Sequence, residues 1–312
     1  MRPDAARWFA RRTWRAADAP PVPDLLALAA GRTASVVIPA LDEEPTVGTV
    51  VSAAQPLVRA GLVDEVLVVD GGSRDGTADV ARAAGARVVA MAGLLPAHGV
   101  RPGKGESMWK ALDATDGDLV VYLDADVLDP SPSWVAGLLW PLLADPDVSF
   151  VKACYDRPLG ASPTGGGRVT ELAARPLLDL LVPALAGVVQ PLAGECAARR
   201  SLLESLPYAG GYAVEIGLLL GAYEVVGLDG LAQVDLGSRR HRNRSTAELG
   251  RMSAAVVAEL LARRDVALHG GTLTQFVRAG GAYAAADRPV SAETRPAMRD
   301  VPEYAARRAR AS

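Results

Sequence analysis

The chain has 312 residues, enough for one large α/β domain with an appendage or for two small domains, and enough to bury a sizeable core. Its residues are 50% hydrophobic and 22% charged, and 33 Lys and Arg against 36 Asp and Glu leave a formal charge of −3. A charge this close to zero excludes a bulk electrostatic preference for nucleic acid or for a membrane surface.

The N-terminal arm and the cysteines favour a cytoplasmic protein. Residues 1–34 have no continuous apolar core and are not typical of a secretory signal. Cys154 and Cys196 lack metal-ligand spacing, which predicts neither a disulfide framework nor a zinc site. The most apolar later segment, 177–189, is interrupted by an aspartate and a proline and is shorter than the roughly 20 residues of a spanning helix. We expect a buried or dimer-interface helix there, with membrane association as the alternative.

Three β-branched runs organise the first part of the chain, and each ends in a polar, turn-forming cluster. They are ASVVIPALDEE from Ala34, DEVLVVDGGSRDGT from Asp64 and DLVVYLDADV from Asp118, with helix-like stretches at 44–61, 77–85 and 106–115. Strands that alternate with helices predict βαβ units and a mostly parallel sheet covered on both faces. Because ligands of such sheets bind at the carboxyl ends of the strands, the three polar clusters should converge on one site.

The composition changes after residue 128. Residues 35–128 predict a nucleotide-binding half, and residues 129–245, with a Gly-rich loop and Leu/Ala-rich helical stretches, predict an acceptor-binding half of the same domain. We expect one helix and then a flexible tail within 246–312.

The third cluster contains two aspartates, Asp124 and Asp126, at the end of an apolar run. Residues two apart on a strand point the same way, so the two carboxylates would repel each other. A Mg²⁺ or Mn²⁺ ion would relieve that repulsion, because such ions usually bind one or two carboxylates together with substrate phosphates. A solvated turn is the alternative explanation of a lone Asp-x-Asp.

The first two clusters could contact a nucleotide. The backbone of residues 39–41 could face a flat ring, and the acidic residues 42–44 could accept hydrogen bonds from a ribose or a base. Asp70 could accept from a uracil or ribose group, and the glycines after it allow a close approach of the backbone. A plain turn would explain either cluster alone.

These clusters resemble those of the GT-A glycosyltransferases, nucleotide-sugar enzymes whose Asp-x-Asp signature holds a metal on the donor diphosphate. Six motifs are similar to those of the glucosyl-3-phosphoglycerate synthases and their mannosyl relatives, and in chain order they read RPGKGESMWKAL, LDADVLDPSP, GGGRVTEL, QPLAGECAARR, GGYAVEIGLLL and DLGSRRHRNRS. The resemblance covers about residues 35–245. It implies a GT-A (Rossmann-like) fold, with a mixed, mostly parallel sheet flanked by helices and a smaller helical acceptor-binding part.

The pattern and the resemblance together assign a donor site and a metal site. The residues expected at the donor are Pro39, Ala40, Leu41, Glu43, Asp70, Gly71, Lys104, Asp124, Ala125, Arg239 and Arg244. The resemblance implies that Asp126 and His241 bind the metal, which suits a carboxylate and a neutral imidazole. As a bare pattern, RRHRNR could also be a basic loop that touches RNA, but the chain lacks the interleaved aromatic residues of such loops.

The Gly-rich loop predicts an anion site. Glycines precede Arg168 and Thr170 at the apparent start of a helix, where backbone N–H groups favour an anion, although such loops are also common without one. The resemblance implies that this loop binds the phosphate of 3-phosphoglycerate through Gly167, Arg168, Val169 and Thr170, with Asn243 assisting.

Two further residues are expected beside the reacting groups. Glu215 lies in an apolar segment, where a carboxylate is costly unless paired. A salt bridge to an arginine would explain it, whereas the resemblance places it beside the sugar as a positioning residue. The resemblance also implies that the Leu192 carbonyl faces the reacting hydroxyl. The catalytic set is thus Asp126, Glu215 and Leu192.

The resemblance implies a retaining, metal-dependent glycosyltransferase that moves glucose from UDP-glucose to the 2-hydroxyl of 3-phospho-D-glycerate, and a homodimer. Ala125, where relatives often have serine, and Asp42, where asparagine is common, leave the donor open to GDP-mannose. The sequence also leaves open another acceptor, a membrane enzyme acting on a polyprenyl phosphate, and a nucleotide-sugar-binding protein without turnover.

Overall fold

The protein is built around one eight-stranded sheet. Its structure, a computed structural model, describes residues 1–159, 162–240, 245–290 and 293–311. The strand order is β1-β11-β6-β9-β5-β2-β3-β4, and all neighbours are parallel except β9, which is antiparallel to β5 and β6. The strands are β1 (Thr13–Arg15), β2 (Ala34–Ala40), β3 (Glu65–Asp70), β4 (Arg87–Ala90), β5 (Leu119–Tyr122), β6 (Phe150–Asp156), β9 (Cys196–Arg199) and β11 (Leu231–Ser238). The predicted mixed, mostly parallel sheet is confirmed.

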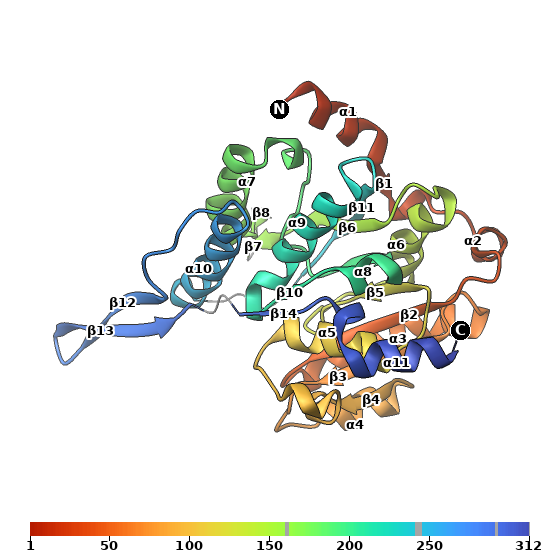
Figure 1. The fold of residues 1–312 in the computed structure, drawn as a ribbon, viewed down its shortest axis with the longest axis horizontal. Helices are drawn as coiled ribbons and strands as arrows, with labels where there is room; N and C mark the ends of the chain where they lie inside the picture. The colour runs from red at the N-terminus through yellow and green to blue at the C-terminus, as the bar shows by residue number, and fades with distance from the viewer. Residues whose placement is uncertain (160–161, 241–244, 291–292, 312) are drawn as a thin grey trace.

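Helices cover both faces of this sheet (Figure 1). Along β2, Val36 and Ile38 pack into one hydrophobic cluster and Val37 into the other, as the alternation of side chains along a strand requires. The first cluster includes residues of α2 (Val22–Ala29), α3 (Glu44–Ala60), α4 (Thr77–Ala83) and α6 (Pro132–Ala144). The second includes residues of α1 (Pro3–Arg12), α5 (Lys104–Ala114), α7 (Arg175–Leu181), α8 (Arg200–Ser205), α9 (Val214–Val226), α10 (Thr246–Ala262) and α11 (Pro302–Ala311).

Short elements connect these layers. The helical turns are η1 (Ala16–Asp18), η2 (Met91–Gly93), η3 (Pro96–His98), the π-helical η4 (Thr170–Ala174), η5 (Pro183–Leu185), η6 (Gly211–Ala213) and η7 (Met298–Asp300). The remaining strands are β7 (Pro158–Leu159), β8 (Ser162–Gly165), β10 (Tyr208–Ala209), β12 (Thr272–Ala279), β13 (Ala282–Pro289) and β14 (Thr294–Arg295).

Five parallel strands bring the functional loops to one edge. β2, β3 and β5 are the three β-branched runs, and α3, α4 and α5 are the helix-like stretches that accompany them. β6 and β11 run in the same direction, with Asp156 paired to Ser238 at their carboxyl ends. Because β6, β9 and β11 belong to the same sheet as β2, the region 129–245 completes the first half rather than forming a second sheet.

The N-terminal arm is part of the fold. β1 pairs with β11 at one edge of the sheet, and the Trp8 indole donates a hydrogen bond of 2.9 Å to the Leu231 carbonyl. The apolar segment 177–189 forms the end of α7 and η5, with Leu178 and Leu185 buried and Leu180 exposed. In the described part of the chain, each helix is too short or too polar to cross a membrane.

The region after residue 262 contains more structure than the flexible tail that the sequence predicted. β12 and β13 form an antiparallel hairpin that extends away from the body of the molecule (Figure 1). β14 then pairs with β10, and α11 packs on the domain. Met298, Val301 and Tyr304, near the end of this region, are buried, but their wide spacing in an Ala- and Arg-rich sequence hides them from a composition-based prediction.

Candidate functional site

A cavity of about 700 Å³ opens at the carboxyl edge of the sheet. Residues that follow β2, β3, β5, β6 and β11 line it, at the edge where ligands of such sheets bind. The predicted site residues in its lining are Pro39, Ala40, Leu41, Glu43, Gly71, Lys104, Asp124, Ala125, Asp126, Gly167, Arg168, Val169, Thr170, Leu192, Glu215 and Arg239. The three polar clusters and the Gly-rich loop therefore do converge.

Four predicted residues are not among the lining residues. Asp70 accepts hydrogen bonds from the Ser73 backbone N–H (3.2 Å) and hydroxyl (2.5 Å), so its carboxylate holds the turn after β3. The other three, His241, Asn243 and Arg244, lie outside the described residues.

Two glycines let the helix that carries Lys104 approach the segment before Glu215. Gly103 has a φ of +110°, and a Cβ there would lie 2.9 Å from the Gly211 Cα atom. A Cβ on Gly105 would overlap the Ala209 carbonyl oxygen. Any larger residue would push α5 away from η6, so the Gly-Lys-Gly sequence is a steric requirement of this contact.

Lys104 joins two of the predicted carboxylates. Its Nζ atom lies 2.8 Å from Glu215 Oε1 and also contacts the Asp124 carboxylate. Burial opposes the charge of Lys104, but Asp124 and Glu215 outweigh it, and the pKa of Lys104 is well above its usual value. Glu215 is thus paired, to a lysine rather than to the arginine considered from the sequence, while it also lines the cavity.

Arg239 bridges the two aspartates. Its Nη2 atom lies 2.6 Å from Asp124 Oδ2 and 3.0 Å from Asp126 Oδ1. Burial alone would raise the pKa of Asp124, but Lys104 and Arg239 together hold that pKa far below its usual range, so the carboxylate stays ionised. A Cβ on Gly194 would overlap the Asp124 carboxylate, so only glycine leaves room for this group.

Asp126 is the described residue that fits a metal. Its side chain is 22% exposed in the cavity lining, and carboxylate oxygens suit Mg²⁺ and Mn²⁺. Within the described ranges, no three His, Cys, Asp or Glu side chains gather as a metal cluster. The predicted second ligand, His241, is outside those ranges, so the metal assignment stays a prediction.

A third carboxylate, that of the buried Glu195, also pairs with Arg239. Glu195 has no exposed surface, and its Oε1 atom lies 2.9 Å from Arg239 Nε. The Tyr155 hydroxyl donates a 2.8 Å hydrogen bond to Glu195 and accepts one of 2.9 Å from Arg157 Nη2. Burial raises the pKa of Glu195, against the lowering effect of Arg239.

Sequence reasoning missed several lining residues and this supporting carboxylate. The missed lining residues are Met91, Pro102, Gly103, Ser107, Arg157, Gly166, Gly211, Tyr212, Leu249 and Met252. A signal existed for Glu195, because an isolated charge inside the otherwise uncharged QPLAGEC stretch needs a partner. Arg157 and Met252 reach the cavity only through the tertiary fold.

The arrangement can hold two anionic groups in one cavity. Asp126 offers a metal ligand for a diphosphate at the ends of β5 and β11, beside Lys104 and Arg239. Arg168 and the backbone of Gly167–Thr170 offer a second anion site in the same lining. This geometry suits the transfer of a group from a nucleoside diphosphate to a phosphorylated acceptor.

Comparisons with known proteins agree with this chemistry. Residues 35–205 match the model of glycosyl transferase family 2. A glucosyl-3-phosphoglycerate synthase of Mycolicibacterium paratuberculosis is 51% identical over 304 residues, which cover 94% of this chain and 92% of that protein. A crystal structure of glucosyl-3-phosphoglycerate synthase from Mycobacterium tuberculosis with Mn²⁺, UDP-glucose and phosphoglyceric acid has a TM-score of 0.86 and 49% identity, and covers 92% of this chain and 98% of that one. A second structure of the same enzyme, with Mn²⁺, UDP-glucose and glycerol 3-phosphate, has a TM-score of 0.82 and 49% identity, with coverages of 89% and 95%.

Proposed function

Because the chain belongs to glycosyltransferase family 2, and within it to the glucosyl-3-phosphoglycerate synthases, we propose that it transfers glucose from UDP-glucose to the 2-hydroxyl of 3-phospho-D-glycerate. One observation carries the proposal: the Asp124–Asp126 pair and the Gly167–Thr170 loop line the same cavity. A relative with a solved structure binds Mn²⁺, UDP-glucose and phosphoglyceric acid. The first two suit the aspartate pair, and the third suits the loop.

The donor occupies the carboxyl ends of β2, β3 and β5. Its nucleotide contacts the segment Pro39–Glu43 and Gly71, and Asp70 acts through the turn that it holds. Asp124, Ala125 and Lys104 face the ribose, the sugar or the diphosphate, and Arg239 and Arg244 neutralise the diphosphate.

Asp126 and His241 hold a Mn²⁺ or Mg²⁺ ion. When bound, the ion supplies Lewis-acid stabilisation of the negative charge on the departing UDP. The cations of this chain contribute beside it, because Arg239 touches both aspartates and Lys104 touches Asp124.

The acceptor phosphate binds Gly167, Arg168, Val169 and Thr170, with Asn243 assisting. Glu215, fixed by Lys104 at 2.8 Å, positions the sugar and the acceptor hydroxyl, and the Leu192 carbonyl accepts from that hydroxyl. A glutamate held by a lysine is suited to a positioning or electrostatic role, which agrees with a retaining transfer that needs no free carboxylate base.

Two further properties belong to this proposal. The protein works in the cytoplasm, where the free thiols of Cys154 and Cys196 stay reduced. It also forms a homodimer through the hairpin of β12 and β13, where Phe276 and Tyr283 are each 69% exposed.

The test is a panel of UDP-glucose and GDP-mannose against 3-phosphoglycerate, with Mg²⁺, with Mn²⁺ or with EDTA, read by mass spectrometry and by the anomeric NMR signal of the product. We expect a glucosyl product of retained configuration from UDP-glucose, and no product in EDTA. The substitution Asp126→Asn should lower turnover by at least about 100-fold. The matched control Asp147→Asn changes an exposed aspartate outside the cavity and should leave turnover unchanged. Equal turnover by Asp126→Asn and wild type would refute the metal assignment.

A further inference from the structure

Arg157 is a cation in the cavity lining to which the proposed function gives no role. It follows β6, whose last residue, Asp156, pairs with Ser238 just before Arg239. Its Nη2 atom donates a 2.9 Å hydrogen bond to the Tyr155 hydroxyl, and its guanidinium lies 5.1 Å from the centre of the Tyr155 ring. Tyr155 in turn donates to the buried Glu195, so the guanidinium of Arg157 is held in place.

The acceptor loop packs directly on the Arg157 side chain. A Cβ on Gly166 would lie 2.7 Å from Arg157 Cβ, and one on Gly167 would lie 3.3 Å from Arg157 Cδ. Gly167 also has a φ of +70°, which favours glycine. The two glycines therefore let the loop that is proposed to bind the acceptor come into contact with Arg157.

Three polar atoms around Gly167 have no hydrogen-bond partner among the described residues. A Cβ on Gly167 would meet Arg157, Thr170 and Gln190, and those residues have the unpartnered buried atoms Nε, Oγ1 and Oε1 respectively. Thr170 is 1% exposed, and Gln190 is fixed by a 3.4 Å hydrogen bond from its Nε2 atom to the Tyr155 carbonyl. Buried polar groups without partners are uncommon in folded proteins and call for a ligand or for water.

The chemistry of these atoms fits an oxygen anion. Arg157 Nε donates only, the Thr170 hydroxyl donates or accepts, and Gln190 Oε1 accepts. An anionic oxygen satisfies the first two, and water satisfies the third, because the single hydroxyl of 3-phosphoglycerate is already assigned to the Leu192 carbonyl. 3-Phosphoglycerate carries its carboxylate on the carbon atom next to that hydroxyl.

The position of Arg157 distinguishes the carboxylate of the acceptor from its phosphate. The phosphate is taken by Arg168 and the loop backbone in the proposed function. The carboxylate is bonded to the carbon that bears the reacting hydroxyl, so it lies nearer to the donor. Arg157 lies on that side of the cavity, because its guanidinium and that of Arg239 lie 5.1 Å and 5.5 Å from the centre of the same Tyr155 ring, and Arg239 contacts Asp124 and Asp126.

We propose that Arg157 binds the acceptor carboxylate and makes the site selective for a phosphorylated hydroxy acid over a phosphorylated alcohol. This inference rests on the proposed function and adds a specificity-determining residue to it. A planar guanidinium matches a carboxylate with two parallel hydrogen bonds, which an ammonium group does not reproduce.

The experiment compares two acceptors that differ by the carboxylate. Wild type, Arg157→Met and Arg157→Lys are assayed with 3-phosphoglycerate and with glycerol 3-phosphate at saturating UDP-glucose and Mn²⁺. Binding of each acceptor in the presence of UDP and Mn²⁺ is measured by calorimetry. We expect Arg157→Met to weaken the binding of 3-phosphoglycerate about 10- to 100-fold, the loss that follows from one charge-assisted hydrogen-bonded pair. The same variant should change the affinity for glycerol 3-phosphate less than about twofold. Arg157→Lys should recover part of the loss.

The controls separate a structural role from a binding role. Arg82→Met removes an arginine of α4 that pairs with the exposed Asp79, and it should change the affinity for neither acceptor. The Michaelis constant for UDP-glucose should also stay unchanged in Arg157→Met. The assignment of Arg157 is overturned if Arg157→Met weakens the binding of both acceptors equally, or if it does not weaken the binding of 3-phosphoglycerate. Wild-type turnover tests the proposed function separately, because it does not depend on the ratio between the two acceptors.

Discussion

Arg239 provides positive charge where Asp124 and Asp126 come together after β5. Its guanidinium lies within 3.0 Å of both carboxylates and 2.9 Å from the buried Glu195. Since three carboxylates share this one side chain, Arg239 fixes their spacing in addition to balancing their charge. A metal at Asp126, as we propose, would therefore meet a carboxylate whose position is already set.

Removal of Arg239 should be costly because it leaves Glu195 buried without a counter-charge. We expect Arg239→Met to lower the free energy of unfolding by about 3–5 kcal/mol, the usual cost of breaking a buried ion pair on one side. The double variant Arg239→Met/Glu195→Gln should be more stable than Arg239→Met alone, because the neutral amide still accepts from the Tyr155 hydroxyl. Urea unfolding of both variants and of Glu195→Gln gives the coupling energy.

The exposed pair Arg82 and Asp79 is the control for this cycle. Its removal should change the free energy of unfolding by at most about 1 kcal/mol. Strict additivity of Arg239→Met and Glu195→Gln would contradict the view that Glu195 is the reason for the loss.

Single residues differ in how far the sequence predicts them. Asp124, Lys104 and Glu215 each lie in a recognisable motif, and the fold brings them into contact. Arg157 lies in no such motif, and it reaches the acceptor loop because two glycines fold back over its side chain. Such a contact depends on tertiary packing, so no local pattern predicts it.

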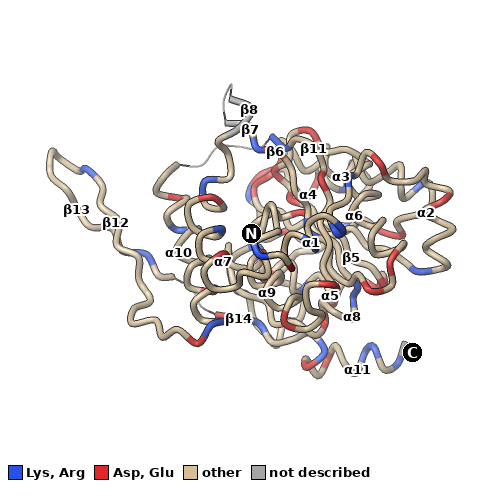
Figure 2. Tube along the Cα trace, turned by 90° about the horizontal axis from the view of Figure 1, so that it is seen from above, with Lys and Arg blue, Asp and Glu red and all other residues tan. Residues whose placement is uncertain are grey.

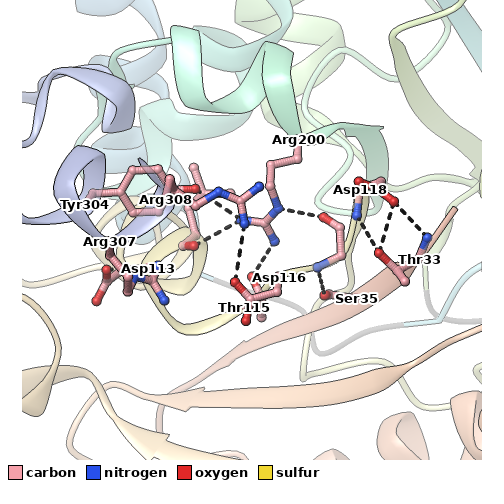
Figure 3. A network of polar contacts seen from close by, with 12 residues as sticks. Thr33, Ser35, Asp113, Thr115, Asp116, Asp118, Arg200, Tyr304, Arg307 and Arg308 are labelled. Atoms are coloured by element: carbon pink, nitrogen blue, oxygen red, sulfur yellow. Dashed lines mark hydrogen bonds and ion pairs between the residues drawn. The ribbon is translucent and has the colours of Figure 1, made fainter. Parts of the chain in front are cut away.

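The C-terminal helix α11 is docked at the opposite, amino-terminal edge of the sheet. Figure 3 shows Arg200 of α8 at the centre of this contact, beside Tyr304 of α11. Arg200 donates hydrogen bonds to the Gly117 carbonyl (2.6 Å) and the Thr115 hydroxyl (2.8 Å), and lies 3.5 Å from the Tyr304 hydroxyl. The Tyr304 hydroxyl donates to Glu204. α11 thus covers the amino-terminal end of β5, away from the cavity.

Tyr304→Phe should loosen this helix without affecting the active site. Loss of the hydroxyl leaves Arg200 and Glu204 with one partner fewer, and we expect a loss of about 1–3 kcal/mol in the free energy of unfolding. Turnover and the Michaelis constants should stay at the wild-type values. Tyr223→Phe, at a half-buried tyrosine of α9 whose hydroxyl has no hydrogen-bond partner among the described residues, is the matched control and should change the free energy of unfolding by less than about 0.5 kcal/mol.

Wild type and Tyr304→Phe also test how the contribution of Tyr304 to stability depends on pH. Burial, and then the hydrogen bond to Glu204, raise the pKa of Tyr304 to about 12. An unfolded tyrosine ionises near pH 10, so the stability that Tyr304 contributes is complete below about pH 10 and is lost as the pH rises toward 12. The stability difference between wild type and Tyr304→Phe should therefore narrow over that range. A difference that stays constant up to pH 12 would show that the hydroxyl is not protected.

At the scale of the whole molecule, the sequence predicts the parallel strands of the central sheet but not the position of β9 or the hairpin of β12 and β13. Alternating strand and helix patterns predict the parallel strands of the central sheet and its ligand-binding edge, because periodicity is a local property and a helix between two strands makes them parallel. β9 enters antiparallel between β5 and β6, and β12 and β13 form a separate hairpin, and neither placement follows from a local pattern. Long-range pairing decides both.

The hairpin of β12 and β13 supports the proposed homodimer. It extends away from the rest of the molecule in both views (Figures 1 and 2), and Arg278, Asp287 and Arg288 are its charged residues. A two-stranded hairpin is at best marginally stable by itself in water, and Phe276 and Tyr283 remain 69% exposed. A second copy of this chain would cover these aromatic side chains and stabilise the hairpin.

We therefore expect wild type to sediment as a dimer at micromolar concentration, and the double variant Phe276→Ser/Tyr283→Ser to sediment as a monomer. The serines remove apolar area that only an interface would bury, so the folded monomer should keep its near-ultraviolet circular dichroism and its affinity for UDP. Thr274→Ser, a change on the same strand that removes no aromatic area, should remain dimeric. Analytical ultracentrifugation over a range of concentrations measures the dissociation constants. A monomeric wild type would contradict the homodimer, and a dimeric double variant would place its interface on another surface.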